Sequence, residues 1–152
     1  MIKIRIIVDQ SSVYDDIEII IRCSKVTDEV KNIMKRLKRE VLTINGEKEG
    51  RQYVLDVKDC FYIETVDNKT FIYAAEEIYE NSNKLYKLED QLKETGFIRI
   101  SKSCILNIDH IASVRALFNG KFEAMLTNSE KIIINRHYVK AFKEKFLGEG
   151  GK

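Results

Sequence analysis

Short apolar runs separated by turn residues occupy the chain from residue 53 to residue 134 and limit the folds open to it. Runs of about four to eight residues bounded by Gly, Asn, Asp or Ser are typical of β-strands. The dipeptide Asn119-Gly120 is the strongest hairpin signal. Strands are expected at residues 53–57, 61–66, 70–74, 97–100, 111–118, 121–127 and 131–134. This pattern predicts a domain of antiparallel strands.

Helical spacing of apolar residues is confined to three short segments. In the first, residues 26–37, Thr27 is placed to cap the helix. The second follows Ser82 as its expected cap and ends before Gly96, which suits a left-handed residue. The third covers residues 139–146. The expected class is therefore mainly β with a few short helices (α+β).

The first 44 residues differ from the rest. Period-two patterning at residues 2–6 and 17–23 predicts two strands ahead of the first helix, which makes a small ββα unit. The polar stretch Asn45–Gly50 breaks every periodicity and is the expected boundary. We therefore expect an extension over residues 1–44, a main domain over 45–147 and a flexible tail over 148–152. The extension either covers one side of the main domain or pairs two chains as a homodimer.

Composition and cysteine spacing indicate a reduced, globular protein. The chain has 152 residues, of which 44% are hydrophobic, enough for a core without disulfides or metals. Cys23, Cys60 and Cys104 lie singly in apolar runs with no CxxC spacing, which favours buried thiols. The N-terminus lacks the continuous apolar stretch of a signal peptide, and no segment approaches the ~20 apolar residues that span a bilayer. We expect a cytoplasmic protein without a membrane partner.

The sequence gives little support to an enzyme. His110 and His137 have no HExxH, HxH or cysteine partner, so no metal site is expected. The GxGxxG, GxxxxGK[ST] and GxSxG motifs are absent, which removes the usual nucleotide and nucleophile sites. No cofactor is expected.

Basic residues concentrate toward the C-terminal end. Residues 99–147 carry nine Lys or Arg and four Asp or Glu, whereas residues 45–98 carry five more acidic than basic residues. A basic end of this kind is either a solvated surface or a positively charged surface that binds nucleic acid.

Two segments in the basic end share a recognisable order of residues. Residues 97–111 read FIRISKSCILNIDHI, residues 117–120 read LFNG, and residues 130–146 read EKIIINRHYVKAFKEKF. The order R-I-S-K-S-x-x-L-N-x-x-x-I, then L-F-N-G, then N-R-x-Y before a short helix resembles the LytTR family of DNA-binding domains. Residues 59–92 resemble the first hairpin and the single helix of that family. The resemblance covers roughly residues 43–147.

The resemblance implies small antiparallel sheets whose loops enter neighbouring major grooves of double-stranded DNA, at sites that are often direct repeats. It places the base-reading loops near Lys69, Lys102 and Arg136. The short polar side chains beside them suit phosphate contacts. These are Asn68, Ser101, Ser103, Asn107, Asn135 and His137. The implied protein is a transcription regulator, and the first 44 residues are too short for the phosphoacceptor receiver domain that family relatives often carry.

The sequence allows two interpretations of several residues. A lysine ammonium is a point charge, so Lys69 and Lys102 suit phosphates, while the planar fork of Arg136 suits guanine. Lys69 also suits plain solvent exposure, and Arg99 suits an ion pair as well as a contact. Asn107 suits the capping or pinning of a turn as well as a DNA contact, and His137 is equally open to a structural role. The alternative function is a protein-interaction or ligand-sensing module that uses exposed aromatic side chains. Its candidates are Tyr14, Tyr53, Tyr79 and Phe118.

Overall fold

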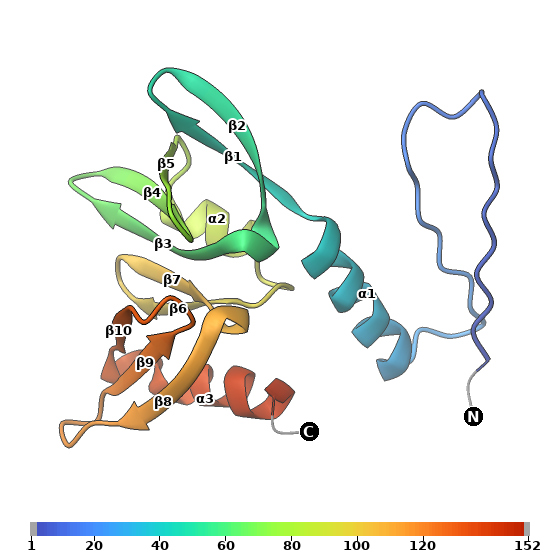
Figure 1. Ribbon diagram of the computed structural model, residues 1–152. Coiled ribbons are helices and arrows are strands. Elements are labelled where there is room, and N and C mark those ends of the chain that lie inside the picture. The colour runs from blue at the N-terminus through green and yellow to red at the C-terminus, as the bar shows by residue number, and fades with distance from the viewer. Residues whose placement is uncertain (1–2, 151–152) are drawn as a thin grey trace.

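The structure of the protein is a computed structural model that describes residues 3–150 (Figure 1). Within these residues the helices are α1 (Asp28–Val41), α2 (Leu85–Gln91) and α3 (Arg136–Gly150), with short 3-10 turns η1 (Val57–Asp59) and η2 (Ile108–His110). The strands are β1 (Thr43–Lys48), β2 (Arg51–Asp56), β3 (Cys60–Val66), β4 (Lys69–Ala74), β5 (Ile78–Asn81), β6 (Phe97–Ser101), β7 (Cys104–Asn107), β8 (Ile111–Ala116), β9 (Phe122–Leu126) and β10 (Lys131–Ile134). The predicted mainly β, α+β class is confirmed.

The strands form two antiparallel sheets, which lie one above the other in Figure 1. The larger sheet has the order β2-β1-β5-β4-β3-β7-β6, and the smaller has the order β10-β9-β8. A hydrogen bond of 2.6 Å from the Tyr62 hydroxyl on β3 to Glu130 joins the larger sheet to the turn between β9 and β10. The expected hairpin at Asn119-Gly120 joins β8 to β9, and Gly120 has the positive φ of 83° that this turn requires.

Two hydrophobic clusters hold the domain together. One lies between the larger sheet and α2 and includes Ile63, Ile72 and Leu88, each fully buried. The other joins the β6–β7 edge to the smaller sheet and α3 and includes Ile100 and Phe142. Because α3 packs on β6 and β10, the start of this helix is fixed against the sheet edge.

The prediction of a ββα unit is only partly correct. The helix forms, and the Thr27 hydroxyl caps it by accepting the Val30 backbone N–H at 3.3 Å. The two strands do not form, since residues 3–27 contain neither strand nor helix; Ile2 lies outside the described residues. Ile6 and Ile17 are 87% and 95% exposed, and an isolated two-stranded ribbon is marginal because its apolar face has nothing to pack against.

Other predicted element boundaries also differ from those in the structure. Asn45–Gly50 is not a break: most of it is strand β1, which turns at Glu49-Gly50 into β2. Ser82 does not cap α2, whose N-cap is Lys84 without a side-chain bond. Helix α3 continues through Gly148 to Gly150, and residues 151–152 of the expected tail lie outside the described residues.

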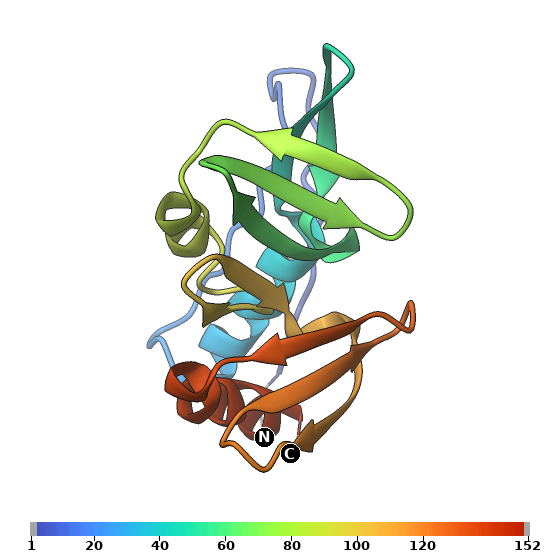
Figure 2. The ribbon, with the colours of Figure 1, turned by 90° about the vertical axis from the view of Figure 1, so that its left-hand side faces the viewer.

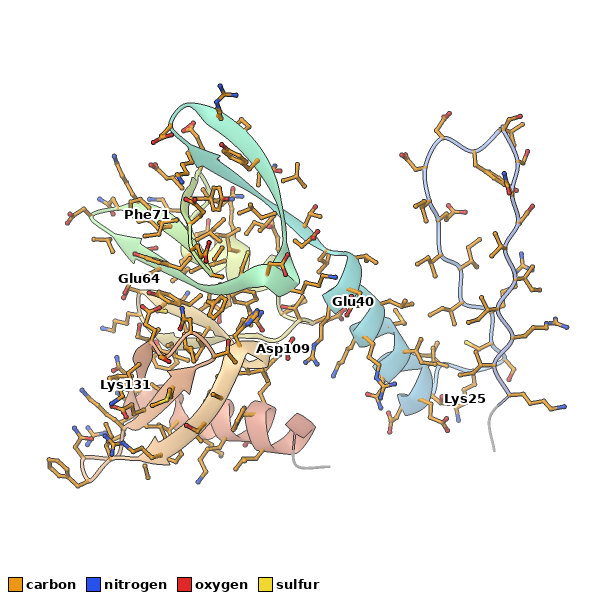
Figure 3. The ribbon with its side chains drawn as sticks, viewed as in Figure 1. Lys25, Glu40, Glu64, Phe71, Asp109 and Lys131 are labelled. Atoms are coloured by element: carbon orange, nitrogen blue, oxygen red, sulfur yellow. The ribbon has the colours of Figure 1, made fainter. Side chains whose placement is uncertain are left out.

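Three ion pairs connect α1 to segments that lie between the strands. Lys38 pairs with Glu94, Glu40 lies 3.1 Å from Lys58, and Arg39 lies 3.9 Å from Asp109. Figure 3 shows Asp109 on the side of the sheets that faces α1, and residues 3–27 lie beyond this helix. No helix in the described part of the chain is long and apolar enough to cross a membrane.

Candidate nucleic-acid interface

The β3–β4 turn carries the first predicted contact, Lys69. Asp67 and Asn68 occupy the two central positions with φ of 52° and 64°, the left-handed pair that a tight type I′ hairpin needs. Lys69 is the first residue of β4, and both Asn68 and Lys69 are exposed. The turn therefore projects an amide and an ammonium away from the sheet.

The β6–β7 turn carries the second, Lys102, which is exposed. The Ser101 hydroxyl accepts the Ser103 backbone N–H at 3.2 Å, and the two hydroxyl oxygens are 3.5 Å apart. Two serine hydroxyls thus flank the ammonium, and hydroxyls of this kind are common phosphate donors.

Arg99 shapes the same turn from inside. Its Nη1 donates to the Lys102 carbonyl at 2.5 Å, while Nε and Nη2 donate to one carboxylate oxygen of Glu89 at 3.2 and 2.9 Å. The guanidinium therefore ties helix α2 to the turn that holds Lys102. The ion-paired reading of Arg99 is the correct one, and the side chain is only 19% exposed.

The third contact, Arg136, is the first residue of α3 and is exposed, as is His137 beside it. The aliphatic stem of Arg136 lies against the β8–β9 turn, where a Cβ added to Gly120 would come within 2.9 Å of the Arg136 Cδ. Asn135 is half-buried and leads from β10 into the helix. The absence of a side chain at Gly120 therefore leaves room for the arginine stem.

Main-chain hydrogen bonds connect the three turns in a row. The Thr65 N–H at the end of β3 donates to the Ser103 carbonyl at 2.8 Å, which joins the first turn to the second. The Asn135 N–H donates to the Ile100 carbonyl at 2.9 Å, which joins the second to the start of α3. Figures 1 and 2 both show the β3–β4 turn, the β6–β7 turn and the start of α3 one below the other along the left-hand edge. The structure thus brings Lys69, Lys102 and Arg136 to one face.

The three cations are available to a ligand. Among the residues that the structure describes, no carboxylate forms an ion pair with Lys69, Lys102 or Arg136. A row of unpaired positive side chains at turn tips attracts a polyanion, since each exposed cation adds to the local potential.

Asn107 does not belong to this face: the DNA contact predicted for it is wrong, and the alternative structural role is correct. It is 1% exposed, its Nδ2 donates to the Cys60 carbonyl at 3.0 Å, and its Oδ1 accepts the Asp109 N–H at 3.1 Å. The amide pins β7 to the start of β3 and caps η2. Gly96 is buried against it, with a close approach and not a left-handed φ as the reason for glycine.

Two further polar residues have structural roles. His110 stacks on Phe61 with ring centroids 4.1 Å apart, and its Nε2 lies 2.5 Å from the Lys58 carbonyl. The Tyr62 hydroxyl bonded to Glu130 has a raised pKa because burial and the neighbouring carboxylate disfavour the phenolate. Both stabilise the fold that supports the turns.

The four aromatic candidates for a protein-interaction surface lie in separate places. Tyr14 lies in the extended N-terminal segment and donates to Asp9, while Tyr53 packs on Tyr79 with ring centroids 5.2 Å apart. Phe118, at 103% exposure, lies in the β8–β9 turn. The aromatic surface expected for a protein-interaction module is therefore scattered over three places.

Sequence reasoning missed Lys140 and Lys143. With Arg136 they follow the spacing i, i+4 and i+7 and so lie on one face of α3. That spacing is visible in the sequence, but polar residues at helical spacing carry no signal until the position of the helix is known.

Comparisons with known proteins agree with this architecture. The sequence matches the LytTr DNA-binding domain over residues 50–147. It is 32% identical over 108 residues to the sensory transduction protein LytT of Enterococcus faecalis, covering 71% of this chain and 44% of that protein. It is 33% identical over 97 residues to the transcriptional regulatory protein LytR of Staphylococcus aureus, covering 64% and 39%. This chain thus spans less than half the length of these relatives.

A solved structure shows the same fold. It is the LytTr DNA-binding domain of a Bacillus cereus protein described as a methyl-accepting/DNA response regulator. The TM-score is 0.64 at 23% identity, and the match covers 68% of this chain and 94% of that domain. Because the family match covers well over half of the chain and the strand-and-helix framework is shared, the chain belongs to the LytTr DNA-binding domain family.

Proposed function

We propose that this chain is a bacterial, cytoplasmic transcription regulator that binds specific double-stranded DNA through the turns before Lys69, around Lys102 and before Arg136. The observation that carries the proposal is the row of three cationic turns, joined by main-chain hydrogen bonds and free of carboxylate partners. Its regulatory relatives support the step from DNA binding to control of transcription.

Each cation has a role that follows from its chemistry. Arg136 reads guanine O6 and N7 in the major groove, because a planar fork can donate to both acceptors. Lys69 and Lys102 bind phosphates, with Asn68, Ser101, Ser103, Asn135 and His137 as further polar donors at the same edge. The operator in this proposal is a direct repeat, which two copies of the domain occupy.

Substitutions at Arg136 and Lys102 test these roles. With a duplex selected from random sequences, Arg136→Ala is expected to cost about 1–3 kcal/mol and to remove discrimination at one base pair. Lys102→Ala is expected to weaken selected and random duplexes equally, because a phosphate contact is independent of sequence. Fluorescence anisotropy measures both. Equal losses on the two duplexes for Arg136→Ala would rule out its reading role.

A homodimer formed by the N-terminal segment is part of the proposal. Residues 3–27 expose a series of large apolar side chains, and extensive exposed apolar surface is typical of protein interaction sites. Sedimentation of the full chain is expected to show a dimer, and replacement of Ile6 and Ile19 by Asp is expected to give a monomer. Ile78→Asp, at an exposed position of strand β5, is the control. A wild-type monomer at micromolar concentration would contradict the dimer.

A further inference from the structure

Beyond the three turns, a shallow groove lies between the β8–β9 turn and helix α3. Gly120 lines one side, and Arg136, Val139, Lys140, Lys143 and Glu144 of α3 line the other. Three cations therefore face one carboxylate in a groove that begins at the last member of the row. We propose that this groove binds phosphates of the duplex on the outer side of Arg136, so that the DNA contact surface continues along α3. The inference rests on the proposed function.

The spacing of the cations suits a DNA strand. Arg136 and Lys143 are seven residues apart on a helix that rises about 1.5 Å per residue, which separates them by about 10 Å along the axis. One DNA strand carries a charge every ~3.4 Å of its axis, so about three phosphates occupy the same length. The three cations of the groove therefore lie within the span of a few consecutive phosphates.

The side chains of the groove are partly held in place. The Lys143 Nζ lies over the Phe122 ring, 5.6 Å from its centroid, and this cation–π contact restricts a flexible side chain. The stem of Arg136 rests on Gly120, whose lack of a side chain lets the turn approach closely. A phosphate that enters the groove therefore meets cations whose positions are already limited.

Glu144 provides a second test, in which the expected change in DNA affinity has the opposite direction. Its carboxylate lines the same groove and repels a phosphate there, so removal of this charge strengthens binding. Lys145 on the same helix provides a matched control, because its Nζ is 3.5 Å from the Lys93 carbonyl and outside the groove.

The experiment compares Lys140→Ala/Lys143→Ala, Glu144→Gln and Lys145→Ala with wild type, using the full chain and a random-sequence duplex. The dissociation constant is measured by anisotropy between 50 and 200 mM salt, roughly the range over which phosphate contacts dominate. Each lost phosphate contact lowers the salt slope by about 0.9, which at 0.1 M salt corresponds to roughly eightfold in affinity. We expect a slope reduced by about 1.8 in the double variant, tighter binding by Glu144→Gln, and wild-type behaviour of Lys145→Ala.

Two outcomes overturn the inference in distinguishable ways. If Lys140→Ala/Lys143→Ala and Glu144→Gln both behave like Lys145→Ala while Lys102→Ala still weakens binding, the groove is not a contact and the proposed function stands. If wild type does not bind duplex, the proposed function fails and the groove site fails with it. Circular dichroism spectra show that each variant is folded before binding is measured.

Discussion

Arg99→Lys is expected to weaken DNA binding although Arg99 is half-buried and held in an ion pair with Glu89. The wild-type guanidinium reaches Glu89 with two nitrogens and the Lys102 carbonyl with a third. A lysine ammonium keeps the charge but has no planar fork, so it satisfies one of these partners and leaves the other. The β6–β7 turn then loses its tie to α2, and Lys102 loses its fixed position.

The magnitude follows from the contacts. A hydrogen bond to a charged group contributes about 1.5–3 kcal/mol, and the partial exposure of the pair reduces this to an expected loss of roughly 1–2 kcal/mol in unfolding free energy. For a chain of this size such a loss lowers Tm by about 2–8 °C. The loss in affinity is at most that of removing the Lys102 contact, roughly eightfold at 0.1 M salt.

The assay combines thermal unfolding with a double-mutant cycle. If Arg99 acts through the turn, Arg99→Lys and Lys102→Ala together weaken duplex binding by less than the sum of their separate effects. Arg115→Lys is the control, because its Nε pairs with Glu123 at 2.9 Å across β8 and β9, outside the β6–β7 turn. A variant that melts with wild type and combines additively with Lys102→Ala would refute the reasoning.

Four further predictions concern the buried residues that support the turns. Asn107→Ala is expected to destabilise the protein by about 1–3 kcal/mol in urea unfolding, because the Cys60 carbonyl loses its donor in the interior. Gly96→Ala is expected to destabilise it as well, since the new Cβ would lie 2.5 Å from the Asn107 Oδ1; a wild-type urea midpoint would contradict this. Burial raises the pKa of Cys60 to about 12 and raises that of Cys104, so in thiol titration near pH 8 only exposed Cys23 is expected to react before unfolding. Folded Cys60 keeps its proton where the unfolded thiol loses it, so its contribution to stability is present below about pH 9 and is lost as the pH rises toward 12.

Local signals predicted the parts of the fold that are decided locally. The Asn119-Gly120 hairpin and the Thr27 cap depend on neighbouring residues, and both are present. Strand β1 was missed because its sequence TINGEK contains glycine and charges, and its pairing with β2 and β5 decides its conformation. The strands expected before α1 had the right pattern, but no surface on which to pack.

The candidate interface shows the same division between features decided locally and features decided by the fold. Lys69, Lys102 and Arg136 follow strands in the sequence, and the turns present them on one face. Asn107 was open to both a structural role and a DNA contact, because the sequence does not show whether an asparagine is buried or exposed. Only the fold shows that its amide closes the start of β3.

The main-chain links between the turns have a consequence for retargeting the domain. Thr65–Ser103 and Asn135–Ile100 are joined through peptide groups, which every replacement of these side chains other than proline preserves. The side chains at positions 69, 102 and 136 can therefore be replaced while the main-chain hydrogen bonds that connect the turns remain. A library that varies positions 69, 102 and 136 alone is expected to yield folded proteins with new sequence preferences, each altered in a separate segment of the duplex.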